Sequence, residues 1–214
     1  SFCGIEQLTI PGSVREIEER AFAACYSLTD VQMEEGIRTI GDGAFAYCEN
    51  LRNITIPASV VSIGANVFQE CTALNYQQYD NAYYIGTANN PYSLLVKALD
   101  TSITQCRIHP DTVKIEAEAF KDCNLLQSVT LPDSLECIDQ YAFYGCQSLQ
   151  QIDLPDSVKE IGKYAFQDCS NLISVVIPDS VTKIGEFAFT GCKSLSSCVV
   201  PKAVRVKEQS LLSF

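Results

Sequence analysis

The sequence predicts a solenoid of short β-strands in which each coil takes about 23 residues. A phenylalanine recurs at this interval, and a cysteine follows each one three residues later. The phenylalanines of this pattern are Phe22, Phe45, Phe68, Phe120, Phe143, Phe166 and Phe189. A fixed period of about 20–50 residues is typical of stacked repeats, each of which packs on its neighbours. A solenoid presents a long open surface instead of a closed pocket, so this fold class favours binding over catalysis.

The first half of a coil is expected to be a strand followed by a turn. Ile152 and Leu154 are separated by one polar residue, and this alternation predicts a short strand with both side chains facing inward. Pro155 lacks an N–H group and ends the strand. Asp156 and Ser157 favour a turn, because their side chains hydrogen-bond to nearby backbone.

The second half returns to the core and closes the coil. Val158 and Ile161 point inward from a second extended piece, Gly162 allows a bend, and Ala165-Phe166 lie in a tight or 3-10/helical turn. Strands of successive coils should lie about 4.8 Å apart, so Leu, Ile and Phe form ladders through the core. Each Phe is expected to stack on the Phe of the next coil. The pattern occurs about nine times, which predicts a mostly β solenoid of about nine coils.

One coil is longer than the others. From Cys71 to Asp100, which takes the cysteine position, there are 29 residues instead of 23. The extra residues predict a hairpin near 82–99 with a Gly/Asn/Pro tip, which projects from the stack or bends it. We therefore expect one elongated domain over residues 1–214. Its predicted parts are regular coils at 1–71 and 100–200, an irregular coil with the hairpin at 72–99, and a tail at 202–214.

Net charge and hydropathy disfavour two classes of partner, nucleic acids and the membrane interior. The net charge is −11, which disfavours nucleic acid, because phosphate binding depends on Lys and Arg. No apolar run reaches the roughly 18 residues of a membrane span, so we expect no membrane insertion in this segment. The chain opens in the middle of a repeat, and we expect it to be a piece of a longer protein.

The repeat resembles a known family. The unit AFxxCxxLxxIxIPxSVxxIG, at residues 142–162 and again at 165–185, is similar to the BspA-like leucine-rich repeats. The insert at 83–92 looks like one that recurs among bacterial members. The resemblance implies a right-handed leucine-rich-repeat solenoid. It also implies an adhesin-like, secreted or cell-surface protein of host-associated bacteria and protists, which binds host proteins or other cells. We expect no cofactor.

The outward positions of the first strands are the leading candidates for a protein-binding face. These positions are expected to line the concave sheet, with polar residues near the middle and apolar residues (Ile173, Val176, Val199) toward the end. Exposed apolar residues on a sheet favour a partner or a second copy; the alternative is an ordinary β face. The candidates are Arg52, Thr55, Tyr76, Gln78, Arg107, Thr130, Asp153 and Val176.

The insert offers an alternative site. Tyr83, Tyr84 and Tyr92 could form an aromatic patch for a protein or stack on sugar rings, which would make the chain a carbohydrate-binding module. The competing interpretation is that they cover the junction between the hairpin and the stack. A third hypothesis is a structural spacer, which predicts no ligand.

Residues with reactive or metal-binding side chains do not form a catalytic pattern. The repeated cysteines are predicted to be buried, reduced thiols, since equivalent side chains of stacked coils point in parallel and suit a disulfide poorly. His109 is expected to be an exposed turn residue. Asp133, Asp156 and Asp179 are predicted to cap their own turns, with a Ca²⁺ site as the alternative. We therefore expect no enzyme activity.

Overall fold

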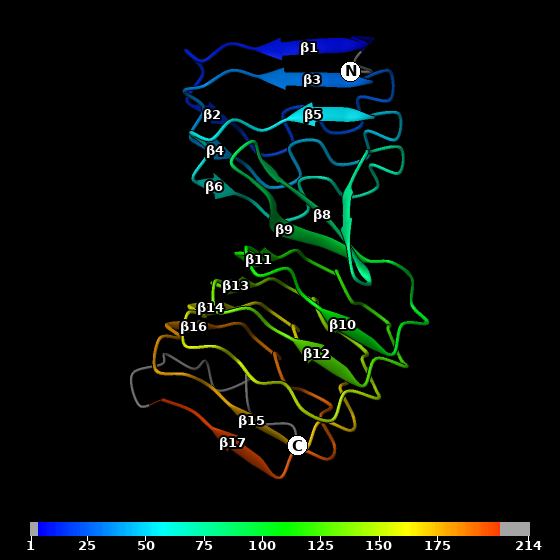
Figure 1. The fold of residues 1–214 in the computed structure, drawn as a ribbon, viewed down its shortest axis with the longest axis vertical. Coiled ribbons are helices and arrows are strands. Elements are labelled where there is room, and N and C mark those ends of the chain that lie inside the picture. The colour runs from blue at the N-terminus through cyan, green and yellow to red at the C-terminus, as the bar shows by residue number, and fades with distance from the viewer. Residues whose placement is uncertain (1–3, 202–214) are drawn as a thin grey trace. The chain divides into compact units, whose positions relative to one another are not determined.

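The computed structural model describes residues 4–201, and these consist of short strands and turns without a helix (Figure 1). Contacts divide the chain into two compact units. Unit 1 comprises Ser1–Gln77 and Gly86–Pro91, and unit 2 comprises Gln78–Ile85 and Tyr92–Phe214. Within the described range, no helix is long and apolar enough to cross a membrane. The predicted tail, at 202–214, lies outside the described residues.

Unit 1 has two three-stranded sheets, one from each half of the coil. The first contains β1 (Gln7–Ile10), β3 (Asp30–Met33) and β5 (Asn53–Thr55). The second contains β2 (Glu16–Ile17), β4 (Thr39–Ile40) and β6 (Ser62–Ile63). All pairs are parallel, and Leu8 pairs with Val31, which pairs with Ile54. The register therefore follows the 23-residue repeat, as the sequence predicted.

Unit 2 repeats this arrangement. Its first strands form the pairs β10 (Gln105–Arg107) with β12 (Ser128–Thr130) and β15 (Ser174–Val176) with β17 (Ser197–Val199). Its second strands are β11 (Lys114–Ile115), β13 (Cys137–Ile138), β14 (Glu160–Ile161) and β16 (Lys183–Ile184). The described residues make about eight turns, close to the nine expected. The predicted mostly β solenoid is confirmed.

The long coil contains the predicted hairpin. It consists of β8 (Ala82–Thr87) and β9 (Asn90–Ala98), and β7 (Gln77–Tyr79) is the next neighbour of β8 in the same sheet. The hairpin does not project freely. Leu94 and Leu95 are buried, and they pair in parallel with Lys114 and Ile115 of β11. Burial of this apolar pair explains why β9 takes a place among the second strands.

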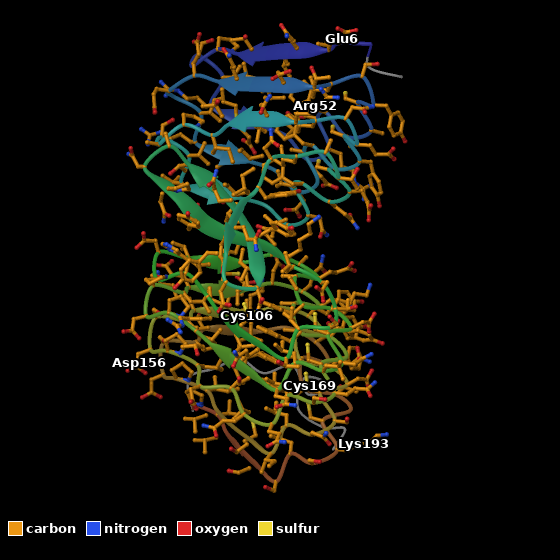
Figure 2. The ribbon with its side chains drawn as sticks, turned by 45° about the vertical axis from the view of Figure 1, so that its right-hand side comes forward. Glu6, Arg52, Cys106, Asp156, Cys169 and Lys193 are labelled. Carbon is orange, nitrogen blue, oxygen red and sulfur yellow. The ribbon has the colours of Figure 1, made fainter. Side chains whose placement is uncertain are left out.

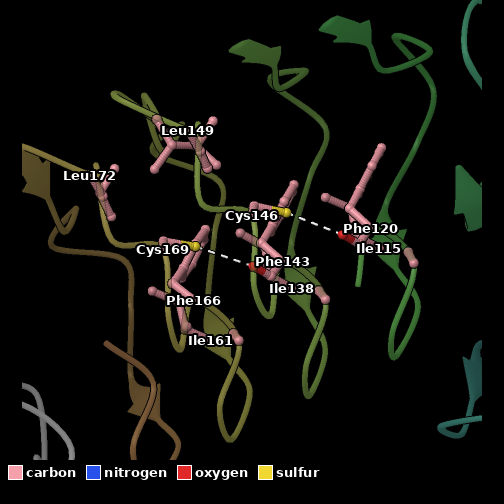
Figure 3. Packing of buried hydrophobic residues seen from close by; sticks show 14 of the residues in the cluster. Ile115, Phe120, Ile138, Phe143, Cys146, Leu149, Ile161, Phe166, Cys169 and Leu172 are labelled. Atoms are coloured by element: carbon pink, nitrogen blue, oxygen red, sulfur yellow. Dashed lines mark hydrogen bonds between the residues drawn. The ribbon is translucent and has the colours of Figure 1, made fainter. Parts of the chain in front are cut away.

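Phenylalanine rings form the predicted ladder through the core (Figure 3). In unit 2, the centroids of Phe120, Phe143 and Phe166 follow one another at 5.0 and 5.2 Å, with interplanar angles of 3°. In unit 1, the rings of Phe22 and Phe45 lie 5.3 Å apart at 12°. Phe143 is completely buried. The stacked rings occupy the interior of the regular coils, whereas the long coil between Phe68 and Phe120 contributes no ring to the ladder.

The repeated cysteines form a hydrogen-bonded ladder beside the rings. Cys146 Sγ donates to the Phe120 carbonyl at 3.1 Å, and Cys169 Sγ donates to the Phe143 carbonyl at 3.2 Å (Figure 3). All ten described cysteines are free, and the seven of the repeat are buried. The predicted reduced state therefore fits the structure. Cys48, Cys71 and Cys192 donate to a Phe carbonyl of the preceding coil in the same way, so these thiols link coils in addition to filling space.

The closing turns are not helical, because two residues in each coil have left-handed backbone. One precedes the Ala-Phe pair and the other precedes the cysteine, as in Tyr164 (φ 60°) and Asp168 (φ 59°). Two such residues four positions apart interrupt any run of helical dihedral angles. The same geometry recurs in the unit 1 coils. The helical alternative for these turns is thus corrected to left-handed corners.

Gly162 is explained by close approach between coils. A Cβ at this position would lie 2.4 Å from the backbone nitrogen of Gln140 in the preceding coil. Its φ is outside the left-handed region, so the bend expected from the sequence is not the reason for glycine. The absence of a side chain allows the two backbones to pack directly.

Candidate functional site

The outward side chains of the first strands form an exposed surface in each unit, which we call the first-strand face. In unit 1 it includes Thr9, Gln32 and Thr55, at equivalent positions of β1, β3 and β5. All three are exposed, whereas Val31 beside them is buried, so strand alternation separates the face from the core. A hollow of about 180 Å³ lies over β1 and β3.

A row of hydrogen-bonded polar side chains borders this face in unit 1. Asn53 Nδ2 donates to Asp30 Oδ1 at 2.7 Å, and Asn75 Nδ2 donates to Asn53 Oδ1 at 2.9 Å. Hydrogen bonds from Asn53 and from the Thr29 hydroxyl lower the pKa of Asp30. Arg52, exposed at the surface, adds a weaker electrostatic effect in the same direction (Figure 2). The row is therefore acceptor-rich and carries a stable negative charge beside a cation.

In unit 2 the first-strand face changes from polar to apolar. Arg107, Thr130 and Asp153 are exposed, and the Arg107 backbone nitrogen donates to Asp80 Oδ2 at 2.7 Å. Val176 and Val199 follow and are 63% and 55% exposed. These two valines pair across β15 and β17. A charged and an apolar section therefore lie on one series of strands.

Two predicted residues of this face are placed differently. Tyr76 is half-buried, and its hydroxyl donates to the Cys71 carbonyl at 3.3 Å. Burial raises its pKa. Gln78 is exposed, but it belongs to β7, which joins the hairpin sheet and not the first strands. The inserted hairpin supplies the neighbour of β7, and this explains the departure from the repeat.

The tyrosines of the insert pack on one another and on His109. Tyr84 is completely buried, and Tyr92 stacks on the His109 ring at 3.9 Å and 9°. Tyr79 meets both Tyr84 and Tyr92 edge-on at 6.4 Å. The buried Tyr84 ring cannot stack on a sugar in this conformation. The cluster instead has the form of the predicted cover over the hairpin junction.

Tyr83 and His109 complete this region. Tyr83 is half-buried, and Lys97 Nζ lies 5.7 Å from its ring centroid. The side chain of His109 is only 18% exposed, so the expectation of an exposed turn residue was wrong. The sequence did not show that the neighbouring hairpin would supply Tyr92 to cover the imidazole.

Burial makes the described thiols poor nucleophiles. It raises the pKa of Cys106, Cys137 and Cys192 to about 12, and that of Cys169 well above its usual value. The thiolate is the reactive form, so a raised pKa suppresses reactivity at neutral pH. Cys137, which is not one of the repeated cysteines, is partly buried.

The carboxylates singled out in the sequence remain separate surface groups. Asp133, Asp156 and Asp179 are all exposed. Among residues 4–201, no group of three His, Cys, Asp or Glu side chains is arranged to hold a metal ion.

A buried ion triad was not foreseen. Lys114 Nζ lies 3.2 Å from Glu116 Oε1 and 3.0 Å from Asp139 Oδ2. Burial lowers the pKa of Lys114, but the two carboxylates more than offset this, and the net direction is upward. Glu116 and Asp139 occupy the position that glycine takes at Gly162. Acidic residues after the inward Ile in two successive coils, together with a lysine directly before the first of these Ile residues, are the signal that could have found this triad.

A second unforeseen feature is a column of aromatic residues in the closing turns of unit 2. Tyr141, Tyr164 and Phe187 directly precede the Ala-Phe pair in successive coils, and their rings stack at 4.8 and 5.2 Å. Tyr144 stands across Tyr141 at 5.8 Å and 66°. The recurrence of an aromatic residue before Ala-Phe was visible in the sequence. The left-handed backbone of these aromatic residues and their half-buried position were not visible in the sequence.

Comparison with known proteins supports the family and the fold. The model of the BspA type leucine rich repeat region matches six copies, over residues 1–89 and 99–213. Comparison with curated proteins gives no match. The pneumococcal vaccine antigen PcpA is 17% identical with a TM-score of 0.55, and the match covers 96% of this chain and 71% of that one.

Two further solved structures are similar. A leucine rich cell surface protein from Faecalibacterium prausnitzii is 23% identical with a TM-score of 0.46, over 96% of this chain and 80% of that one. A leucine-rich repeat protein from Eubacterium ventriosum is 20% identical with a TM-score of 0.48, over 94% and 74%.

Proposed function

Since the chain belongs to the BspA-type leucine-rich repeat family, we propose that it is a non-enzymatic, adhesin-like module that binds a protein partner through its first-strand face. The observation that carries the proposal is the open series of exposed side chains on the first strands, held in register by parallel pairing. The family resemblance supports a place at the bacterial cell surface or outside the cell.

The chemistry of this face in unit 2 suits a protein partner. Ile173, Val176 and Val199 are 51%, 63% and 55% exposed and lie on or beside β15 and β17. Arg107 belongs to the same series of first strands. Protein interfaces combine an apolar centre with a polar rim, and arginine is enriched among the residues that carry affinity. The apolar section would supply buried area, and Arg107 would supply a charged anchor.

The reactive side chains of the described residues support a non-enzymatic module. The thiols are buried with raised pKa values, and His109 is covered by Tyr92. General acid–base or nucleophilic catalysis needs such groups within reach of a substrate. The repeat holds them in the core, where they stabilise the stack.

A binding screen tests the proposal. The purified domain is presented to immobilised extracellular host proteins, and each saturable hit is compared with the variants Arg107→Ala and Val176→Asp. We expect both substitutions to weaken binding at least tenfold. Lys193→Ala is the matched control, because it also removes one exposed cation from unit 2 but lies outside the first strands (Figure 2). A hit that none of these variants changes would contradict the assignment of the face.

A structural spacer is the competing hypothesis. The spacer hypothesis predicts no saturable partner at all, whereas the protein-binding module predicts at least one. If no protein in the screen binds, the spacer hypothesis is favoured. A partner whose binding is weakened by Arg107→Ala would exclude the spacer hypothesis.

A further inference from the structure

The column of aromatic residues in unit 2 borders a hollow. The hollow has a volume of about 530 Å³ and is lined by Glu118, Lys121, Tyr141, Tyr144, Tyr164 and Gln167. We call these six residues the tyrosine platform. All of them lie in the closing turns and none in a strand, so the platform is separate from the first-strand face. A volume of about 300–1,000 Å³ is the usual range for small-molecule sites.

The backbone of the platform is costly to form with these side chains. Tyr141 and Tyr164 have φ angles of 57° and 60°. A bulky residue is rare in the left-handed region. Left-handed corners nevertheless recur in every regular coil, so this backbone belongs to the repeat and only the aromatic side chains are particular to the platform. The equivalent corner holds Arg20, Gly43 and Asn66 in unit 1 and Glu118 in unit 2, with φ angles of 54°, 59°, 56° and 63°. The fold itself therefore does not require an aromatic residue there.

The rings are arranged to leave part of their surface for a ligand. Tyr141 and Tyr164 each cover one face of the other at 4.8 Å, and Phe187 stacks on Tyr164 at 5.2 Å, so Tyr164 presents mainly its ring edge and hydroxyl group. Tyr144 stands at 66° to Tyr141, and its flanking equivalents, Lys121 and Gln167, are not aromatic. Among residues 4–201, no ring stacks parallel on Tyr144, and Tyr141 has a parallel ring on one side only.

Polar groups of both kinds surround these rings. Lys121 Nζ lies 3.1 Å from Glu118 Oε1, and Gln167 carries an amide that both donates and accepts. Lys163 Nζ lies 4.9 Å from the centroid of Tyr164 and 3.3 Å from Glu186 Oε2. A ligand here would meet an apolar ring together with paired donors and acceptors.

We propose that the tyrosine platform binds a neutral oligosaccharide. One pyranose ring of the sugar would lie against Tyr144, and the hydroxyl groups of the sugar would bond to Glu118, Lys121 and Gln167. A pyranose has an apolar C–H face and a polar rim, which matches this combination. The platform spans three coils, roughly 10 Å at the strand spacing of stacked coils, and this suits one or two sugar rings. The net charge of −11 disfavours sialylated or sulfated glycans.

A proline-rich peptide is the other occupant that aromatic grooves accept. Such a peptide advances about 3.1 Å per residue, so three coils would contact only about three residues of it. The short hollow and its charged rim favour the sugar.

The test is a glycan array that contains neutral, sialylated and sulfated oligosaccharides, followed by titration calorimetry with the best neutral hit. The informative variants are Tyr144→Ala and Tyr164→Asn. The second introduces the residue that unit 1 carries at Asn66, so it should keep or raise the Tm. We expect each variant to weaken sugar binding at least tenfold.

Tyr47→Asn is the matched control. Tyr47 is also a tyrosine with left-handed backbone (φ 62°), it is 44% exposed, and it lies in unit 1. This variant should bind the sugar as the parent chain does. The proposal is overturned if no neutral glycan binds, if a proline-rich peptide binds the platform instead, or if Tyr144→Ala and Tyr164→Asn leave the affinity unchanged. Loss of a protein partner in the Arg107→Ala variant would affect none of these outcomes.

Discussion

Cys169 shows how a single residue serves the repeat. Its thiol is completely buried and donates to the Phe143 carbonyl, and burial raises its pKa well above the usual value. At neutral pH the proton therefore stays on sulfur, and the hydrogen bond between coils is retained. The same residue type in an exposed position would be a nucleophile or a disulfide partner.

The raised thiol pKa values predict a loss of stability in alkali. Unfolded thiols release their proton near pH 9, whereas folded Cys106, Cys137 and Cys192 keep it until about pH 12. As pH rises between these values, only the unfolded state releases these protons, so the free energy of unfolding falls. The slope is about 1.4 kcal/mol per pH unit for each thiol. Urea unfolding near pH 8 and near pH 10 measures it.

The contribution of one thiol can be isolated. The Cys106→Ala variant should lose less stability between the two pH values than the parent chain does, because one fewer proton is released on unfolding. Equal free energies of unfolding near pH 8 and near pH 10 would contradict the mechanism.

Gly162→Ala should be strongly destabilising. The new Cβ would lie 2.4 Å from the Gln140 nitrogen, and backbone atoms cannot yield as a side-chain tip can. We expect a loss of about 1–3 kcal/mol or more, the cost of overpacking. Gly4→Ala is the control, since nothing lies within 4 Å of a Cβ there. Thermal unfolding of both variants decides; similar Tm values would refute the close-approach argument.

At the residue scale, burial was predicted correctly for side chains whose neighbours are set by the 23-residue repeat. The cysteines fall beside the ring ladder in every regular coil, so their burial was predictable. His109 and Tyr84 depend on the hairpin, whose packing partner lies elsewhere in the chain, and the sequence could not show which of them would be covered. The left-handed backbone of Tyr164 was not predictable for a different reason. Gly and Asn are the residues that indicate such a backbone, and at this corner they occur only in unit 1.

The element that stabilises each unit most directly is the phenylalanine ladder. Phe143→Ala should cost about 3–5 kcal/mol, because the ring is completely buried between two others and its removal leaves a cavity. Phe22→Ala should cost less, since Phe22 is half-buried. Urea denaturation of the two variants makes the comparison. A larger loss at Phe22 would contradict the ladder as the source of stability.

Strands were predictable as elements, and closing turns were not. The alternation around Ile152 and the inward Ile161 depend only on the period of side chains along an extended chain. The hairpin at 82–99 was located by its excess length and turn residues. Its incorporation beside β11 depends on where Leu94 and Leu95 find an apolar neighbour, and this is a tertiary effect that no local pattern contains.

At the scale of the whole molecule, the fixed register predicts which deletions are tolerated. Removal of residues 150–172 takes out one 23-residue coil and joins Leu149 to Ile173 in the same phase. We expect a folded β protein with lower stability, because each repeat contacts only its neighbours. Circular dichroism and thermal unfolding measure the outcome.

Deletion of 150–171 is the matched control. It removes one residue fewer and shifts the following strand by one position, so inward side chains turn outward. This variant should fail to fold or should lose far more stability than the coil deletion. Equal behaviour of the two deletions would show that register does not govern assembly.

The buried thiol ladder has a consequence for the lifetime of the protein. Among residues 4–201, eight free sulfhydryls are buried and those of Cys137 and Cys198 are partly buried, so in oxidising surroundings the folded chain protects most of its thiols. A coil that opens exposes several of them at once, and disulfides formed at that moment prevent the ring ladder from re-forming. The rate of local opening, more than the equilibrium free energy of unfolding, would then set how long a molecule remains intact.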